Sequence, residues 1–127
     1  MEDLIHELVA AYNSGGRDSM MAMVDENAVA VVPDTMPNGG TYRGHAGIGG
    51  MLDSWEEAWD PFSVELGEVE DAGDAAIASV IQRGRGRGSG VEVQLALQWL
   101  VRERDGKLVY WRLCESVEEA RRLSSIG

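Results

Sequence analysis

The sequence is poor in the residues that build disulfides and metal sites. Among its 127 residues there are one cysteine, Cys114, and two histidines. A single cysteine cannot form an internal disulfide, which predicts a protein of the reducing cytoplasm. So few scattered cysteine and histidine side chains are not expected to bind a transition metal. No phosphate-loop spacing with its lysine is present either, so we expect no cofactor.

Long apolar runs and an excess of positive charge are also missing. No apolar stretch approaches the ~20 residues of a membrane helix, and the acidic start Met1–Leu4 lacks the basic segment of a signal peptide. Eleven lysines and arginines against 22 acidic residues give a net charge of −11. This balance argues against nucleic acid and membranes as partners. The length suits one domain spanning residues 1–127.

Two long strands near the C-terminus give the clearest structural pattern. Apolar residues occupy alternate positions from Val91 to Val101, with mostly polar residues between them. This period of two is typical of a half-buried strand. The chain turns near Asp105-Gly106 and returns through residues 107–113 as the second strand.

The apolar pattern also predicts how these two strands pair. A two-residue turn would set Trp99 opposite Arg112 and move a whole apolar set to the wrong face. A three-residue loop with Gly106 left-handed sets Trp99 opposite Trp111 instead. We therefore predict that second register, in which Glu115 lies on the inner face opposite Leu95.

The preceding residues predict helices followed by strands. Helical spacing is seen over residues 4–12, and Asp18 can cap a short helix after Gly15-Gly16. Residues 28–32 are predicted to form a buried strand. Tyr42-Arg43-Gly44 leads into a third helix, whose apolar stripe continues to Trp59 until Pro61 ends the helix. Strands are expected over residues 62–66 and 75–85, and a capping box of Ser116 and Glu119 opens a last helix over residues 117–123. This order predicts an α+β fold with helices on one face of a sheet.

Short motifs spread along the chain resemble a known superfamily. They are Tyr12-Asn13-Ser14-Gly15-Gly16, Tyr42-Arg43-Gly44-His45-Ala46-Gly47-Ile48, Gly88-Ser89-Gly90, Arg104-Asp105-Gly106-Lys107 and Trp111-Arg112. In order and spacing they resemble the nuclear transport factor 2-like superfamily, in its branch of SnoaL-like polyketide cyclases and ketosteroid isomerases. The resemblance implies a cone-shaped, cystatin-like α+β barrel, in which a curved mixed or antiparallel sheet wraps around N-terminal helices. It also implies an apolar cavity and a homodimer formed through the outer sheet face.

The catalytic residues of the best understood relatives do not carry over. Ketosteroid isomerases use a first-helix tyrosine, a base beside a proline and a protonated acid on a later strand. The corresponding positions here hold Leu8, Val32, and either Gln98 or Trp99. Limonene-epoxide hydrolases carry an acid after a Trp-Arg pair, where Leu113 stands here. Both chemistries are therefore disfavoured.

Two carboxylates remain as candidate catalytic groups. Asp34 shares the face of Val32 if the strand continues past Pro33, and a carboxylate in an apolar pocket can act as a general base. The alternative is an ordinary turn aspartate. Glu115 is either a buried acid on the inner strand face or a solvated residue where that strand frays.

A set of apolar and aromatic residues is predicted to line a pocket for a small hydrophobic molecule. The set is Tyr12, Val32, Met51, Trp55, Trp59, Leu97, Trp99, Trp111 and Leu113. The alternative is that they form an ordinary core, with Tyr12 as a packing residue. Cys114 is interpreted as a structural thiol.

Three classes of function stay open. The first is a cofactor-independent isomerase or cyclase that uses Asp34 or Glu115. The second is a non-catalytic binding protein for a hydrophobic metabolite. The third is an assembly module whose dimer surface is its function, as the resemblance to nuclear transport proteins implies. A homodimer is expected because Ala96, Leu100 and Tyr110 would otherwise leave an apolar patch on the outer face. The alternating Arg83, Arg85 and Arg87 are interpreted as a solvated hairpin tip, with pairing to carboxylates as the alternative.

Overall fold

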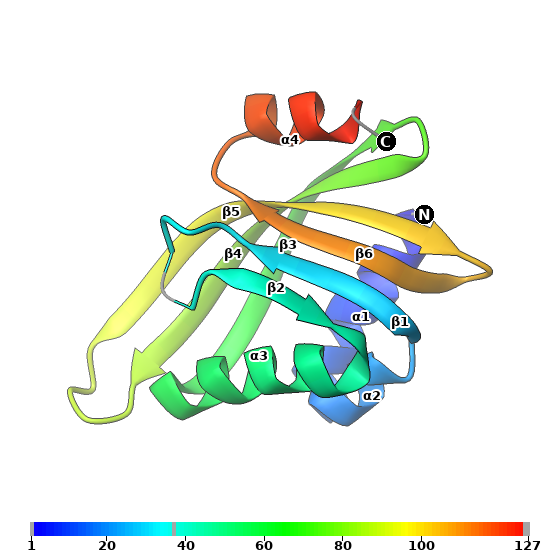
Figure 1. Ribbon diagram of the computed structural model, residues 1–127. Coiled ribbons are helices and arrows are strands. Elements are labelled where there is room, and N and C mark those ends of the chain that lie inside the picture. Colours follow the sequence, from blue (N-terminus) through cyan, green and yellow to red (C-terminus); the bar gives the residue numbers. More distant parts are fainter. Residues whose placement is uncertain (1, 37, 126–127) are drawn as a thin grey trace.

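The computed structural model describes residues 2–36 and 38–125, which form four helices and six strands (Figure 1). In chain order they are α1 Glu2–Gly15, α2 Arg17–Met21, β1 Val24–Val32, β2 Gly40–Arg43, α3 Gly44–Ala58, β3 Trp59–Ala72, β4 Ala75–Gly86, β5 Glu92–Arg104, β6 Lys107–Cys114 and α4 Val117–Ser124. The strands make one sheet in the order β2-β1-β6-β5-β4-β3, with β1 and β6 parallel and the other pairs antiparallel. The predicted α+β class is confirmed, with a curved sheet that does not close into a barrel.

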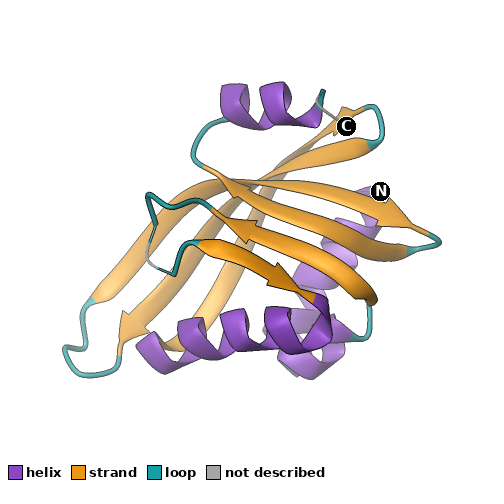
Figure 2. Ribbon diagram, viewed as in Figure 1, coloured by secondary structure: helices purple, strands orange, loops and turns teal. Residues whose placement is uncertain are grey.

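Helices cover both faces of the sheet, so the prediction that they lie on one face is wrong for α4. Figure 2 shows α1, α2 and α3 on one side and α4 on the other. The main core lies between the sheet and the first three helices, and a smaller apolar cluster lies beneath α4. The first face therefore encloses the largest apolar interior of the described chain.

The first helix forms as the sequence predicts. One stripe of α1 is buried, and it consists of Leu4, Ile5, Leu8, Val9 and Tyr12. Gly16 follows with φ +79°, a left-handed conformation that glycine adopts readily, and its N–H bonds the Tyr12 carbonyl at 3.0 Å. The predicted cap of the second helix is wrong, because Gly16 holds the N-cap position and Asp18 lies inside α2.

The region from β1 to α3 differs from the prediction at three places. β1 begins at Val24, four residues earlier than expected, and Gly40–Arg43 forms β2 along its edge. Trp59, which was expected on the helix, instead begins β3 and pairs with Gly86. A proline disfavours helical backbone at the residue before it. Pro61 therefore ends the helix upstream of its own position.

The predicted register between β5 and β6 is wrong, although the predicted faces are right. Trp99 lies opposite Leu113, and Trp111 lies opposite Val101. Asp105 and Gly106 both have positive φ, as a two-residue type I′ turn requires. A bulge between the Arg102–Tyr110 and Glu103–Leu108 pairs then adds one residue to β6. Because of this extra residue, the apolar side chains of β6 again lie on the inner face of the sheet.

The outer face is partly covered by α4, so the prediction that Leu100 lies in an exposed apolar patch is wrong. Leu100 is 1% exposed and belongs to a cluster with Ala75, Ile77, Cys114 and Ala120. The predicted capping box is supported by a 3.1 Å bond from the Glu119 N–H to the Ser116 hydroxyl. Leu100 therefore stabilises the packing of α4 within one chain and is not available to a partner.

Gly84 should be far less tolerant of alanine than Gly88. A Cβ at Gly84 would lie 2.7 Å from the Cβ of Trp59, whereas one at Gly88 would meet no atom within 4 Å. Overpacking of this kind costs about 1–3 kcal/mol. We expect Gly84→Ala to lower the free energy of unfolding by that amount in denaturant titrations. Gly88→Ala should leave it unchanged or slightly raised, and equal effects would contradict the tight Trp59 packing.

Candidate functional site

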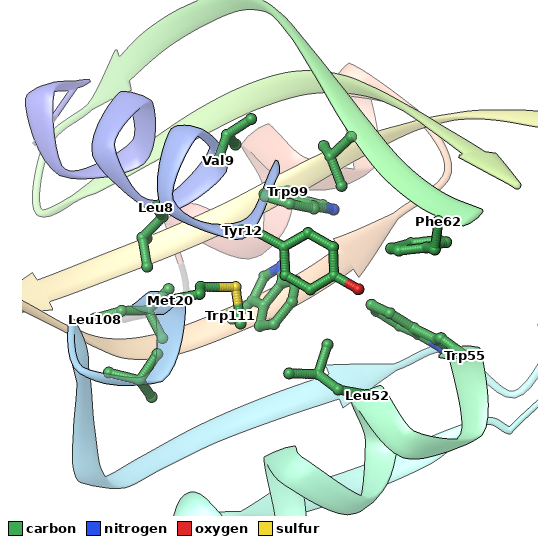
Figure 3. Close-up of a pocket in the computed structure, with 12 residues that line it drawn as sticks. Leu8, Val9, Tyr12, Met20, Leu52, Trp55, Phe62, Trp99, Leu108 and Trp111 are labelled. Carbon is green, nitrogen blue, oxygen red and sulfur yellow. The ribbon is translucent and has the colours of Figure 1, made fainter. Parts of the chain in front are cut away.

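An apolar cavity lies between the sheet and helices α1, α2 and α3 (Figure 3). Its walls are Leu8, Val9, Tyr12, Met20, Val24, Leu52, Trp55, Phe62, Val64, Trp99, Leu108 and Trp111. The cavity measures about 20 Å³, which is room for about one water-sized group. The interior is therefore almost filled by its own side chains.

The predicted pocket residues divide between this cavity and its surroundings. Tyr12, Trp55, Trp99 and Trp111 line the cavity. Val32, Met51, Leu97 and Leu113 are buried in the core without lining it. Trp59 lies outside it, packed against Gly84.

Aromatic rings form one connected group around the cavity. The ring centroids of Trp99 and Trp111 lie 5.0 Å apart at 70°. Trp55 contacts Trp111 edge to face at 5.9 Å, and it also contacts Phe62 at 5.7 Å. Phe62 in turn meets Tyr12 at 5.8 Å. All of these contacts except the tilted Trp55–Phe62 pair are edge to face, an arrangement that favours fixed ring orientations.

Two polar atoms of this apolar group have no partner. The indole nitrogens of Trp99 and Trp111 are buried, and no acceptor contacts them among residues 2–36 and 38–125. A buried donor without a hydrogen bond typically costs about 1–3 kcal/mol. The cavity surface itself is entirely apolar, so the two N–H groups are buried in the core beside it.

A wider, more polar groove adjoins the cavity. The groove measures about 370 Å³, and its walls are Tyr12, Gly16, Glu56, Trp59, Asp60, Pro61, Phe62 and Arg87. Tyr12 and Phe62 belong to both the groove and the cavity. These two rings therefore separate the buried interior from a solvent-accessible groove of a size typical for small ligands, roughly 300–1,000 Å³.

A cluster of polar side chains lies at this boundary. The Tyr12 hydroxyl donates a 2.7 Å hydrogen bond to Oε2 of Glu56, and Arg17 Nη1 lies 3.4 Å from Oε1 of the same carboxylate. Arg17 also pairs with Asp53 and donates to the Gly49 carbonyl at 2.8 Å. Helices α1 and α3 and the start of α2 therefore meet through one hydrogen-bonded network.

The environment of Tyr12 keeps its hydroxyl protonated. Burial raises the pKa of Tyr12, and the hydrogen bond to Glu56 and the charge of that carboxylate raise it further, while the positive charge of Arg17 opposes the shift. A phenol with a raised pKa remains a hydrogen-bond donor at neutral pH. Glu56 is the acceptor in this pair.

The two carboxylates predicted from the sequence lie elsewhere. Asp34 is exposed in a turn after β1, where the N–H of Met36 bonds the Pro33 carbonyl at 3.0 Å. Glu115 is exposed beyond the end of β6 and accepts a hydrogen bond from the Thr35 hydroxyl. Neither carboxylate lines the cavity or the groove.

The alternating arginines pair with carboxylates of their own chain. Arg83 lies 2.9 Å from Glu65, and Arg85 lies 3.0 Å from Glu92. Arg87 is 3.7 Å from Asp60 and donates to the Glu56 carbonyl at 3.0 Å. Arg87 therefore also satisfies a carbonyl in the last turn of α3.

The thiol of Cys114 should be unreactive in the folded protein. Burial raises its pKa to about 11, and the charge of Glu119 adds to the shift. Only about one thiol in a thousand is then ionised at pH 8, and the thiolate is the reactive form. We expect an aromatic disulfide reagent to react at least ~100-fold more slowly with the native chain than with the unfolded chain in guanidinium. Equal rates would contradict the burial of Cys114.

Two further properties concern only the part of the chain that the structure describes. No helix there is both long and apolar enough to cross a membrane. No three histidine, cysteine, aspartate or glutamate side chains within residues 2–36 and 38–125 are grouped so that they could hold a metal ion.

Solved structures of similar fold match nearly the whole chain. TerC, co-crystallised with polyporic acid, is 19% identical with a TM-score of 0.79, over 98% of this chain and 97% of TerC. A protein of ketosteroid isomerase-like fold from Catenulispora acidiphila, in complex with trimethylamine, is 15% identical with a TM-score of 0.77, over 97% and 92% of the two chains. A nuclear transport factor 2-like protein from Burkholderia thailandensis is 24% identical with a TM-score of 0.77, over 87% and 86%. These similarities establish the fold.

Sequence comparison adds the family. No curated protein matches the chain significantly. The sequence model of the SnoaL-like domain, in contrast, matches residues 5–111, from the first helix to the last strand. The match includes the helices and strands that enclose the cavity and the groove. The chain therefore belongs to the family of SnoaL-like domains.

Proposed function

We propose that this SnoaL-like domain binds a small, largely apolar molecule between its sheet and helices, and that Glu56 transfers a proton at the polar end of that molecule. The observation that carries the proposal is the shared wall of Tyr12 and Phe62. On one side of it lies an apolar cavity, and on the other a groove with charged groups. A ligand in the groove can place its apolar part against Tyr12, Trp59 and Phe62 and its polar part near Glu56.

Glu56 is the best placed general base. Its carboxylate is half-buried, and it is held by the Tyr12 hydroxyl at 2.7 Å and by Arg17 at 3.4 Å. A positioned carboxylate can remove a proton next to a carbonyl group, which leaves an enolate, and then return the proton to carbon. The reaction needs no cofactor. Tyr12, whose hydroxyl stays protonated, acts as a hydrogen-bond donor that positions Glu56.

Proton exchange of 1-tetralone tests this proposal without knowledge of the natural substrate. In D₂O the protein should accelerate the replacement of the C2 protons of this ketone by deuterium, followed by proton NMR. Glu56→Gln keeps the shape and an acceptor for Tyr12 but removes the base. It should lose about 10²–10⁴-fold of the acceleration, the usual contribution of a general base.

The control variant distinguishes Glu56 from the acids that the sequence suggested. Asp34→Asn changes an exposed carboxylate outside the groove, so it should retain the full exchange rate. Loss of exchange in Asp34→Asn with retention in Glu56→Gln would return the catalytic role to Asp34. Tight binding of the ketone without exchange would contradict catalysis and favour a non-catalytic binding protein.

We also propose a homodimer through the part of the outer sheet face that α4 leaves open. A groove of about 170 Å³ lies there, with Ser79, Ile81, Ala96 and Gln98 among its walls. Nearby, Arg112 has a buried Nε without a partner among the described residues. Apolar, amide and arginine groups together suit a protein interface.

The proposed setting is the cytoplasm, where the buried thiol of Cys114 would stay reduced.

Light scattering of the purified protein tests this assembly. The wild type should have the mass of a dimer at micromolar concentration, and Ala96→Glu should be a folded monomer, because it places a charge in the centre of the interface. Ala46→Glu, at an exposed position of α3, is the matched control and should remain a dimer. A monomeric wild type, or a dimer unaffected by Ala96→Glu, would contradict the proposed interface.

A further inference from the structure

We infer that Arg87 is a second catalytic residue of the groove, whose guanidinium stabilises the negative charge that forms on the substrate oxygen when Glu56 removes a proton. This inference rests on the proposed proton transfer and adds the group that binds the enolate. It starts from a difference among the three alternating arginines, because only Arg87 lines the groove within the described chain.

Arg87 is held beside Glu56 by two hydrogen bonds to the end of α3. Its backbone N–H donates to the Ala58 carbonyl at 3.3 Å, and its Nε donates to the Glu56 carbonyl at 3.0 Å. Figure 1 shows the loop between β4 and β5 beside this end of α3. The backbone of Glu56 therefore positions Arg87, while the side chain of Glu56 supplies the base.

The terminal nitrogens of Arg87 remain available to a ligand. In Arg83 and Arg85 a terminal nitrogen donates to a carboxylate of the chain, at 2.9 Å and 3.0 Å. Nη2 of Arg87 lies 3.7 Å from Asp60, which is too far for a hydrogen bond, and both side chains are more than half exposed. Such an exposed pair contributes little stability. A charged ligand oxygen can therefore replace the water around these nitrogens.

The proposed reaction requires a positively charged group in the groove. The proton moves to the Glu56 carboxylate, and the electron pair of the broken C–H bond moves onto the carbonyl oxygen; both return when the carbon is protonated again. Donors placed where this charge develops lower the barrier. Within the described chain, Arg87 is the only positively charged side chain that lines the groove. The Tyr12 hydroxyl already donates to Glu56, and Arg17 pairs with the carboxylates of Glu56 and Asp53.

Proton exchange of 1-tetralone tests the inference with a matched control. Arg87→Met removes the charge and keeps much of the side-chain volume. It should lower kcat of the exchange about 10–100-fold and change KM little, because the donor acts mainly on charge that develops in the transition state. Arg85→Met removes an arginine that pairs with Glu92 outside the groove, so it should keep the full rate. Arg87→Lys retains a positive charge and should recover part of the loss.

Binding of 1-naphthol distinguishes stabilisation of charge from a positional effect, because Arg87→Met also removes the bond to the Glu56 carbonyl. 1-Naphthol has the skeleton of 1-tetralone, and its ionised form carries the oxygen charge of the enolate. In the Glu56→Gln background, which mimics the protonated base, ultraviolet absorbance measures the ionised fraction of the bound naphthol. Adding Arg87→Met should lower the ionisation constant of the bound naphthol about tenfold. The Kd of naphthalene should stay the same and thus show that the groove is intact.

The outcomes separate this inference from the proposed function. Loss of exchange in Glu56→Gln with full exchange in Arg87→Met would overturn the inference and leave the proposed base intact. Equal ionisation of bound naphthol with and without Arg87 would also overturn it, because this residue would then act only through the position of α3. A wild type that does not exchange the protons of 1-tetralone would overturn the proposed function and the inference together.

Discussion

Leu100→Ala should lower the free energy of unfolding by about 2–5 kcal/mol, the usual cost of truncating a fully buried leucine. Leu100 is 1% exposed beneath α4, where it packs with Ile77 and Ala120. Its small neighbours Ala75, Cys114 and Ala120 cannot extend into the space that alanine would leave. Chemical denaturation followed by circular dichroism measures the loss.

Leu95→Ala provides the matched control on the same strand. Leu95 is 45% exposed, so its truncation should cost less than about 1 kcal/mol. Similar losses for the two variants would contradict the cover that α4 gives to Leu100. An unfolded Leu100→Ala variant would show the predicted direction, and Leu100→Val would then supply a measurable value.

Trp111→Ala should have the largest effect on the main core, about 3–5 kcal/mol. The Trp111 ring contacts both Trp99 and Trp55. Its removal would join the existing cavity to a larger void, and the two neighbouring rings would each lose a packing partner. Thermal and urea unfolding of the purified variant measure this loss.

Trp111→Phe should cost much less than Trp111→Ala, below about 2 kcal/mol, for a reason specific to this site. Tryptophan-to-phenylalanine changes often remove a hydrogen bond, but the Trp111 N–H has no partner among the described residues. Deleting an unsatisfied donor offsets part of the lost packing. A cost as large as that of alanine would indicate that this N–H is hydrogen-bonded in the folded protein.

Local patterns predicted most of the secondary structure. The α1 stripe, the β5 strand and the Ser116 cap each depend on residues close in sequence, and all three are present. The predicted burial along β5 is correct for Leu97, Trp99 and Val101 and wrong for Val93 and Leu95, which are exposed. The predicted register between β5 and β6 was wrong because a two-residue turn and a bulge occur together. Each alone would have reversed the inner face, and apolar alternation reports the face without reporting the number of bulges.

The candidate site could be predicted only in part. Tyr12 and the tryptophans were found because they lie on apolar stripes. Glu56 and Arg17 were missed, since their meeting depends on how α1, α2 and α3 pack, and no spacing along the chain encodes that approach. Glu56 directly follows the buried Trp55 and lies beside the apolar stripe of the helix, so the stripe alone does not mark it as a site residue.

The role suggested for Asp34 depended on β1 continuing past Pro33. The chain turns there instead, and β1 gains its extra length at the other end, from Val24. Proline has no N–H for the sheet and restricts the residue before it, so a turn directly after Val32 is the simpler outcome. The acid near the apolar interior comes from α3 rather than from this strand.

A crystal structure of the protein with 1-tetralone would test the central claim most directly. We predict the ketone in the groove, with its rings against Trp59 and Phe62 and its C2 within about 3–3.5 Å of a carboxylate oxygen of Glu56. A ketone bound on the outer sheet face, or one in the groove with C2 turned away from Glu56, would contradict the account.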